Sequence, residues 1–480
     1  MFSIIILPNA KKQLLRLDKK IIEDFFERLG IGFEEVDKIG LNKENTKTKN
    51  SNFSMNLLKI HNTLPKKIEV KDFVRNFKNR FKFIKKILQE HSELDNLISI
   101  NRIEESKQMS IIGMVYSKRL TKNGNVLIEL EDLSGKVSAI INKDKEELFE
   151  KSNELLLDEV IGVKCSGSKE IVFVNEIIFP DAKIHEKKTS KYEESVAFIS
   201  DLHVGSKKFL EKNFLKFIDW INGNIGNDNQ KKEALQIKYL FITGDSIDGV
   251  GIFPGQEKEL AIQDVKEQYK KLADLLSKIR SDIQMVICPG QHDAVRVAEP
   301  QPIIPETYAE PLYYLKNINF TTNPSLVGVG KGFKLKVLMY HGASMHGIIN
   351  SINKLRLGSG HDSPTSVVKY MLMKRHLAPT HSLVTYTLVE DEDALLIKEI
   401  PDVIATGDLH RPEIASYNGI LLVASSCWQS RTPFEEKVGN NPDPCKVPVL
   451  NLKTREIKIW DFSSGLDKYG NEIKGEKDEN

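Results

Sequence analysis

Short apolar runs, often rich in β-branched residues, divide the second half of this chain into segments. Five of these runs end where glycine, aspartate or histidine begins a loop. They cover residues 195–199, 239–242, 285–288, 337–339 and 403–405. A short apolar run that stops in this way is typical of a buried strand. We therefore expect an α/β region over residues 193–464, with polar side chains gathered where its strands end.

Alternating apolar and polar residues in the first half of the chain predict a second, all-β region. The alternation runs from Met109 to Ile141, with turn signals at Asn123-Gly124 and Ser134-Gly135. It resumes at residues 160–166 and 171–178. Five short strands of this kind are typical of an OB-fold barrel, a frequent binder of nucleic acids. We assign this barrel to residues 97–182 and a polar linker to residues 183–192.

Helical periodicity precedes the expected barrel. Apolar residues at helical spacing predict a helix near residues 10–29, within an N-terminal helical segment of residues 1–38. A second stripe predicts a helix within a basic segment, residues 66–96, that leads into the barrel. The basic face of this helix is either a solvated surface or a contact for DNA or a partner. Residues 39–65 have the composition of a flexible linker, and residues 465–480 that of a disordered tail.

Composition narrows the class of protein without deciding it. A chain of 480 residues predicts two or three domains. The formal net charge of +2 implies that any affinity for nucleic acid comes from local patches. The 4 cysteines stand far apart, which argues against a disulfide framework or a structural zinc site and indicates a reducing cytoplasm. We find no apolar run of about 18 residues, so we expect no membrane segment.

The loops after the five apolar runs carry the candidate chemistry. Their carboxylate, amide and imidazole groups suit two divalent metal ions. Taken singly, each residue also has an ordinary explanation as a strand-end carboxylate, a helix cap or a packed polar group. The set in order favours a metal centre. The motifs are Asp201-Leu202-His203, Gly244-Asp245-Ser246, Gly290-Gln291-His292-Asp293, Tyr340-His341-Gly342 and Gly407-Asp408-Leu409-His410.

The order of these motifs resembles the calcineurin-like metallophosphoesterase superfamily, whose pattern is D-x-H, G-D, G-N-H-D, a lone H and G-H-x-H. The resemblance implies an α/β sandwich with two divalent ions, Mn²⁺ or Mg²⁺. It also implies that His292 stays off the metals and steadies the scissile phosphate or protonates the leaving oxygen. The first ion would be held by Asp201, His203, Asp245 and His410, and the second by Asp245, Gln291, His341 and Asp408.

Two residues depart from the pattern of that superfamily, and both belong to the second metal site. Gln291 stands where asparagine is usual, and Asp408 stands where histidine is usual. Glutamine keeps the amide oxygen on a longer side chain, and aspartate exchanges an imidazole for an anionic oxygen ligand. We interpret the site as retuned rather than lost, because Asp201, His203 and Asp245 are all present.

An OB-fold followed by a phosphoesterase region is similar to the family of small subunits of archaeal D-family DNA polymerases. Residues 375–379 and 427–444 also resemble that family. The resemblance implies a proofreading 3′–5′ exonuclease that acts on single-stranded or primer-end DNA beside a separate large catalytic subunit. The resemblance also makes a sliding clamp a candidate partner. A structural subunit with a lapsed site and a stand-alone phosphoesterase are the alternatives.

Two basic residues after a predicted helix are candidate DNA contacts. Arg375 could grip a phosphate, because a guanidinium group matches phosphate oxygens in a fork, and His376 lies beside it. The alternative, which we weigh equally, is a positive charge that stabilises the C-terminal end of the helix.

Overall fold

The computed structural model describes residues 55–59, 68–105, 108–184, 186–332, 334–358, 360–389, 392–438, 440–467 and 470–471. The predicted N-terminal helical segment lies outside these residues, as do most of the predicted linker before residue 66 and most of the predicted tail. Within the described ranges, no helix is both long enough and apolar enough to cross a membrane.

Five strands close into a barrel where the alternating pattern predicted strands. In β3, Val126, Ile128 and Leu130 are buried while the residues between them are partly exposed, as the two-residue period of a strand requires. The barrel order is β2-β3-β4-β6-β5, and the pairing of β4 with β6 is parallel. The strands are β2 (Gln108–Leu120), β3 (Val126–Glu131), β4 (Lys136–Ile141), β5 (Val160–Gly167) and β6 (Ile171–Ile178), with α5 (Glu146–Asn153) and the 3₁₀ turn η2 (Ile100–Arg102) beside them.

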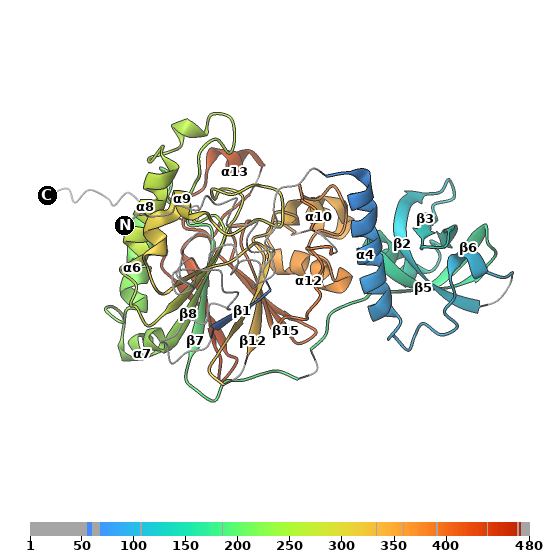
Figure 1. The fold of residues 1–480 in the computed structure, drawn as a ribbon, viewed down its shortest axis with the longest axis horizontal. Helices are drawn as coiled ribbons and strands as arrows, with labels where there is room; N and C mark the ends of the chain where they lie inside the picture. Colours follow the sequence, from blue (N-terminus) through green and yellow to red (C-terminus); the bar gives the residue numbers. More distant parts are fainter. Residues whose placement is uncertain are drawn as a thin grey trace, which may run out of the picture. The chain divides into compact units, whose positions relative to one another are not determined.

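The other described strands form two six-stranded sheets (Figure 1). The first has the order β10-β9-β8-β7-β16-β17 and the second the order β1-β11-β12-β13-β15-β14. The first comprises β7 (Ser195–Ile199), β8 (Ile237–Thr243), β9 (Gln284–Cys288), β10 (Ile318–Phe320), β16 (Lys446–Asn451) and β17 (Ile457–Asp461). The second comprises β1 (Met55–Lys59), β11 (Ser325–Val329), β12 (Leu335–Met339), β13 (Val403–Thr406), β14 (Glu413–Tyr417) and β15 (Ile420–Ala424).

An apolar layer joins the two sheets. It contains Phe198 and Phe241 from the first sheet together with Val337, Met339 and Val403 from the second, all fully buried. The other faces of the central strands are covered as well, by further apolar clusters. Strands buried on both faces read as continuous apolar runs, which is why these segments were visible in the sequence.

Helices complete the layers on the outer faces of the two sheets (Figure 1). Phe214, Phe217 and Trp220 of α6, which lie on one face of the helix, pack with residues of the first sheet. The first sheet is accompanied by α6 (Glu211–Ile221), α7 (Asp228–Gln236), α8 (Val265–Leu276) and α9 (Glu306–Tyr313). The second is accompanied by α10 (Met345–Ser351), α11 (Asn353–Leu357) and α12 (Pro364–Lys374), while α13 (Pro433–Val438) and the 3₁₀ turn η3 (Gln256–Lys258) lie in loops.

The basic helix α4 (Val70–Leu88) contacts both the barrel and the region around the second sheet (Figure 1). Its apolar face packs against Ile112 and Val160 of the barrel. Arg80, which belongs to the basic set of this helix, is buried and forms an ion pair with Asp393, with Nε 2.8 Å from Oδ2. A second buried pair joins Lys374 of α12 to Glu159 beside β5, with Nζ 2.6 Å from Oε2.

One part of the predicted linker is a strand. Residues Met55–Lys59 form β1, which pairs antiparallel with β11 so that Met55 faces Val329. Leu58 packs against the apolar core. This pairing joins residues far apart in the chain, and the local composition of residues 39–65 gave no sign of it. The linker prediction is therefore wrong for these five residues.

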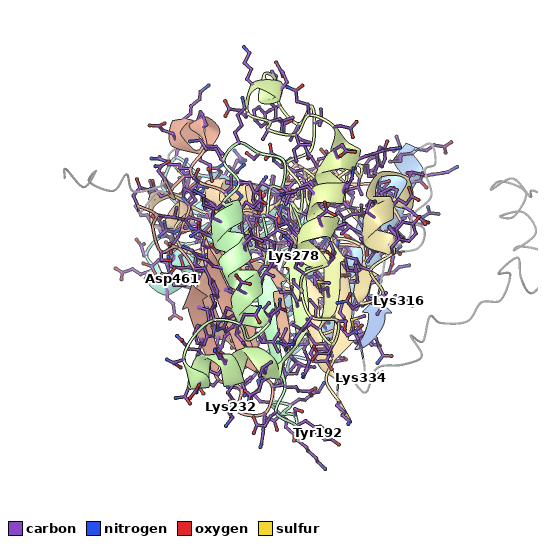
Figure 2. All side chains as sticks on the ribbon, turned by 90° about the vertical axis from the view of Figure 1, so that its left-hand side faces the viewer. Tyr192, Lys232, Lys278, Lys316, Lys334 and Asp461 are labelled. Carbon is purple, nitrogen blue, oxygen red and sulfur yellow. The ribbon has the colours of Figure 1, made fainter. Side chains whose placement is uncertain are left out.

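The surface chemistry agrees with the modest net charge. Figure 2 labels four exposed lysines that lie apart from one another on one face: Lys232, Lys278, Lys316 and Lys334. All 4 cysteines of the chain are free thiols inside the protein, so the prediction that they form no disulfide framework is confirmed.

Candidate metal centre

The five predicted loops meet, but they come from two sheets rather than from one sheet edge. The loops after β7, β8 and β9 belong to the first sheet, and those after β12 and β13 belong to the second. The face-to-face packing of the sheets brings both sets of strand ends together. A pattern along the chain cannot show this step, because it depends on contacts between distant strands.

The backbone of these loops is unusual. Twelve described non-glycine residues have a positive φ, and five of them are predicted ligands. Such left-handed conformations are uncommon for residues with a Cβ atom, and they gather at functional sites where the surrounding structure holds them. The five residues and their φ angles are Asp201 (50°), His203 (50°), Asp245 (48°), Asp408 (68°) and His410 (56°).

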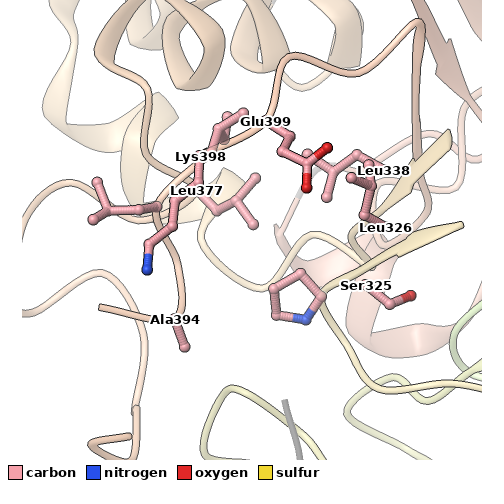
Figure 3. Close-up of a pocket in the computed structure, with 10 residues that line it drawn as sticks. Ser325, Leu326, Leu338, Leu377, Ala394, Lys398 and Glu399 are labelled. Carbon is pink, nitrogen blue, oxygen red and sulfur yellow. The ribbon is translucent and has the colours of Figure 1, made fainter. Parts of the chain in front are cut away.

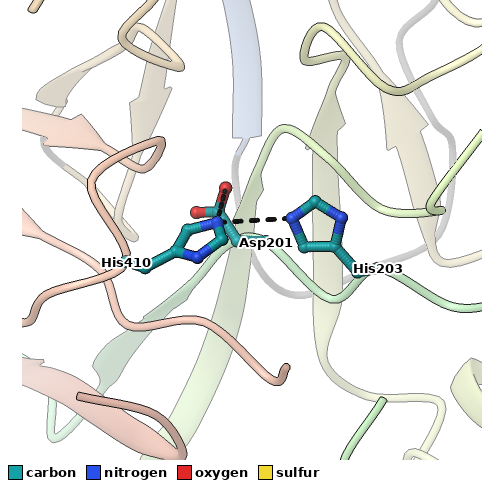
Figure 4. Close-up of side chains that lie close together, drawn as sticks. All are labelled: Asp201, His203 and His410. Atoms are coloured by element: carbon teal, nitrogen blue, oxygen red, sulfur yellow. Dashed lines mark hydrogen bonds and ion pairs between the residues drawn. The ribbon is translucent and has the colours of Figure 1, made fainter. Parts of the chain in front are cut away.

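Asp201, His203 and His410 form the first group of ligands (Figure 4). The His410 Nε2 atom lies 3.3 Å from Asp201 Oδ1 and 3.3 Å from His203 Nε2. The other ring nitrogens face carboxylates: His203 Nδ1 is 3.0 Å from Asp248 Oδ1, and His410 Nδ1 is 2.7 Å from Glu435 Oε1. A carboxylate at Nδ1 holds the proton there and directs the Nε2 lone pair to the centre, as in metal-binding histidines.

His341 stands at the second group of ligands and is fully buried. Its Nδ1 atom lies 2.8 Å from the Thr243 carbonyl oxygen, which can only accept a hydrogen bond. In the neutral ring, Nε2 therefore carries a lone pair. That atom is 3.2 Å from Asp245 Oδ2, 3.9 Å from Asp201 Oδ1 and 3.9 Å from Asp408 Oδ1. Burial lowers the pKa of His341, but the charges of Asp245 and Asp201 outweigh it and raise that pKa well above its ordinary value. The position of Nε2 therefore suits either a proton or a cation held between the carboxylates.

The two departures from the superfamily pattern contact each other. Gln291 donates a hydrogen bond from Nε2 to Asp408 Oδ1 at 3.0 Å. Three buried atoms here have no hydrogen-bond partner among the described residues: Gln291 Oε1, His341 Nε2 and Asp408 Oδ2. Each such atom costs about 1–3 kcal/mol when it stays unsatisfied. All three are of a type that coordinates Mn²⁺ or Mg²⁺, so these residues fit a second divalent ion.

The charges of the site prepare its carboxylates to bind cations. Burial alone would raise the pKa of Asp245, but the nearby His341 and His292 outweigh it and hold that pKa far below its ordinary value. The pKa of Asp201 is also lowered, because His410 and His341 outweigh the effect of its burial. Both groups are therefore anionic at neutral pH.

A cavity of about 440 Å³ opens over both groups of ligands. Its lining includes His203, Asp245, Asp408 and His410, and also His292. Because His292 Nδ1 lies 2.8 Å from the Asp248 carbonyl oxygen, its other ring nitrogen is the atom that can exchange a proton.

A different pocket, beside Leu326 and Leu338 (Figure 3), holds only about 30 Å³, which is space for about one water molecule.

Two residues that orient the ligands were missed by the sequence reasoning. The Asp248 carboxylate accepts from His203 and also from Gln429 Nε2 at 3.2 Å. The Glu435 carboxylate contacts His410 and accepts from the Thr432 backbone N–H at 2.8 Å. Asp248 stands three residues after Asp245, which is a weak signal. Glu435 lies within residues 427–444, which resemble the polymerase family, but it is 25 residues away from His410, the ligand it contacts.

Asp248→Asn should weaken Mn²⁺ binding about tenfold, because residues that orient a ligating histidine commonly contribute a factor of ~10–100 to metal affinity. Titration of the full chain with Mn²⁺, followed by the electron paramagnetic resonance of the free ion, measures this affinity. Asp264→Asn is the matched control, since Asp264 caps the exposed start of α8 and asparagine caps equally well. Equal affinity of the two variants would contradict an orienting role for Asp248.

The structure corrects the prediction of DNA contacts for Arg375 and His376. Both side chains are buried. Arg375 donates from Nε to the Ile397 carbonyl oxygen at 2.9 Å, and His376 Nε2 lies 3.0 Å from Asp393 Oδ2. Arg375 has a φ of 54° and ends α12, so the chain turns inward at this point. These residues fasten the end of the helix to residues 393–398 and do not face a DNA surface.

Comparisons with known proteins identify relatives of this chain. Residues 196–415 match the family model that describes the B subunits of DNA polymerases alpha and epsilon. The DNA polymerase II small subunit of Methanothermobacter thermautotrophicus is 42% identical over 396 residues, which cover 82% of this chain and 80% of that protein. The protein of the same name from Pyrococcus furiosus is 38% identical over 404 residues, covering 82% of this chain and 64% of that protein.

Likeness to solved structures is weaker. A structure described as a novel archaeal phosphodiesterase has a TM-score of 0.27 and 12% identity, and the alignment covers 55% of this chain and 98% of that one. This likeness supports no argument about function. The sequence identity to proteins named DNA polymerase II small subunit is much higher, and it agrees with the motifs quoted from the sequence. The chain therefore belongs to the family of DNA polymerase II small subunits, the small subunits of the archaeal D-family DNA polymerase.

Proposed function

We propose that this chain is the proofreading 3′–5′ exonuclease subunit of its polymerase and that it hydrolyses DNA phosphodiesters with two divalent metal ions. One observation carries the proposal. Five of the seven predicted ligands line a single cavity, the other two contact them, and three of their buried atoms have no hydrogen-bond partner among the described residues. A site kept only for structure would be expected to satisfy or replace such atoms.

The positions of the predicted ligands assign them to two metal ions. Asp201, His203, Asp245 and His410 would hold one ion, and Asp245, Gln291, His341 and Asp408 the other. Bound Mn²⁺ or Mg²⁺ would supply positive charge to the phosphate and lower the pKa of water. Asp245 joins the two groups, since its Oδ2 atom is 4.0 Å from His203 Nε2 and 3.2 Å from His341 Nε2. His292 holds a proton for the leaving oxygen.

The proposal also covers the role of the barrel and the proteins and DNA that this chain would contact. We infer that the five-stranded barrel is an OB-fold, which its closed five-strand order and the parallel pairing of β4 with β6 support. Such barrels commonly bind single-stranded nucleic acid. The name small subunit implies a large catalytic subunit that carries out synthesis. Primer-end DNA would then pass between the two subunits, and a sliding clamp is a further partner to test.

The test is digestion of a primer whose 3′ end is mismatched. The full chain is purified with and without its large subunit and supplied with Mn²⁺ or Mg²⁺. We expect stepwise release of nucleotides from the 3′ end, faster at the mismatch than at a paired end, and no release in EDTA. Absence of hydrolysis in either metal, with and without the large subunit, would instead support a structural subunit with a lapsed site.

The hydrogen bond between Gln291 and Asp408 predicts that changes at these two residues are coupled. Gln291→Asn and Asp408→His should each weaken binding of the second Mn²⁺ ion, because each leaves the other partner unpaired. The double variant, which recreates the usual ligand pair of the superfamily, should recover much of that loss. Mn²⁺ titration of the four proteins measures a coupling of about 1 kcal/mol. Strictly additive effects would show that the two departures are independent.

A further inference from the structure

Part of the lining of the cavity is apolar. Ile252, Phe253 and Pro254 line the same space as Asp245 and His292. Among the lining residues that the structure describes, Phe253 carries the only phenyl ring, and it is 38% exposed. Apart from Pro433, the remaining lining is polar, charged or glycine. A half-exposed phenylalanine in such surroundings leaves apolar surface in water, which a flat apolar ligand would cover.

Two buried glutamines hold the loop that carries this ring. Gln256 accepts from the Ile252 backbone N–H at 2.9 Å and donates to the Asp248 carbonyl oxygen at 2.8 Å. Gln268 accepts from the Gly249 N–H at 2.9 Å and donates to the Gly249 carbonyl oxygen at 3.1 Å. Both glutamine side chains are fully buried. The backbone next to Phe253 is therefore held in place, while the Phe253 side chain stays partly exposed.

Gly249 sets the distance between this loop and the turn that carries His292. It has a φ of 71°, and a Cβ atom there would lie 2.3 Å from the His292 carbonyl oxygen. Asp248, the preceding residue, contacts His292 Nδ1 through its own carbonyl oxygen. The loop that carries the phenyl ring and the turn that carries the imidazole are therefore packed directly against each other.

This arrangement separates two kinds of contact within one cavity. The metal ligands would hold the positive ions, and His292 the proton, that hydrolysis of a phosphodiester requires. The nucleoside attached to that phosphate must then occupy the rest of the same cavity of about 440 Å³, whose lining includes the apolar residues. A base offers a flat face to an aromatic ring only when it has left the stack of a duplex, and such stacking is favourable for any base.

We propose that Phe253 stacks on the 3′-terminal base of an unpaired primer end and thereby selects frayed or mismatched ends over paired ones. Phe253 is then a specificity-determining residue that takes no part in the chemical step. The inference rests on the proposed exonuclease function, and it names the substrate of that site as a single nucleotide drawn out of the duplex.

Binding without hydrolysis tests the stacking by itself. A single-stranded oligonucleotide with 2-aminopurine at its 3′ end is titrated with the full chain. The base is chosen because stacking quenches its fluorescence, and EDTA is present so that the oligonucleotide is not hydrolysed. We expect strong quenching by the wild type and little by Phe253→Ala, with affinity about tenfold weaker, in line with the loss of one stacked base. Phe253→Trp should restore the quenching. Tyr314→Ala, which truncates an aromatic ring 70% exposed on the surface next to α9, should behave as the wild type.

Hydrolysis in Mn²⁺ then separates the inference from the function on which it rests. Phe253→Ala should lower the preference for mismatched over paired ends by raising KM for mismatched ends, with kcat on single-stranded DNA nearly unchanged. Quenching by the wild type without hydrolysis would overturn the exonuclease proposal and keep the stacking. No quenching by the wild type, or equal quenching and selectivity in Phe253→Ala, would overturn the inference even if hydrolysis is normal.

Discussion

Asp245→Asn should reduce hydrolysis of single-stranded DNA on the order of 1,000-fold, which is typical for loss of a group on which the whole centre depends. Asp245 contacts ligands of both groups, and its charge offsets the repulsion between two dications. Asparagine keeps the shape of the side chain and an oxygen that can accept the 2.8 Å hydrogen bond from the His292 N–H. The effect should therefore come from lost charge rather than from a changed fold.

The measurement is the rate of nucleotide release in Mn²⁺, accompanied by thermal unfolding and by the number of Mn²⁺ ions bound. Asp274→Asn, on the exposed side of α8, removes one carboxylate outside the cavity and serves as the matched control. Hydrolysis by Asp245→Asn at the control rate would refute the assignment of Asp245 as the shared ligand. Loss of activity together with unfolding would leave Asp201→Asn, measured by Mn²⁺ stoichiometry, to decide the same point.

Asp393→Ala should destabilise the protein by about 3–5 kcal/mol, the usual consequence of removing one partner of a buried ion pair. Asp393 is 3% exposed and accepts from Arg80 Nε at 2.8 Å, while His376 Nε2 lies 3.0 Å away. Without this carboxylate, the Arg80 guanidinium group stays buried with no counter-charge beside it. Urea unfolding monitored by fluorescence measures the loss in the free energy of unfolding.

The same carboxylate predicts how stability depends on pH. Burial alone would raise the pKa of Asp393, but Arg80 and His376 outweigh it and hold that pKa far below its ordinary value. Because the folded pKa is depressed, this contribution to stability is present above about pH 4 and is lost as the pH falls further. The double variant Arg80→Met, Asp393→Leu should lose less stability than Asp393→Ala. A larger loss in the double variant would show that the pair matters through its shape rather than its charge.

The fold was predictable wherever a local pattern carries the information. The barrel strands alternate with a two-residue period, and the strands buried between two layers are continuous apolar runs ending in polar residues. The predicted ligands lie at one cavity or in contact with the residues that line it for the same reason, since each follows closely on a strand end. Both features are encoded within windows of a few residues.

The remainder depends on contacts between distant parts of the chain. Asp248 and Glu435 orient ligands through pairs formed only in the folded protein. Arg375 reads as a surface cation in the sequence, but its left-handed backbone turns it into the interior, where carbonyl oxygens accept its hydrogen bonds. Gln291 and Asp408, the two departures from the superfamily pattern, are joined by a hydrogen bond. Neither residue indicates this link in the sequence.

The position of β1 at the edge of the second sheet affects which strand is open to pairing with another copy of the protein. β11 has β12 on one side and β1 on the other, so β1 covers backbone N–H and C=O groups that would otherwise point to solvent. An uncovered edge of this kind is a template for pairing with a strand of another molecule. A shortened chain that begins after Lys59 would expose that template, whereas one that begins at Asn52 would keep it covered. Loss of these few residues should therefore favour strand pairing between copies of the chain through β11.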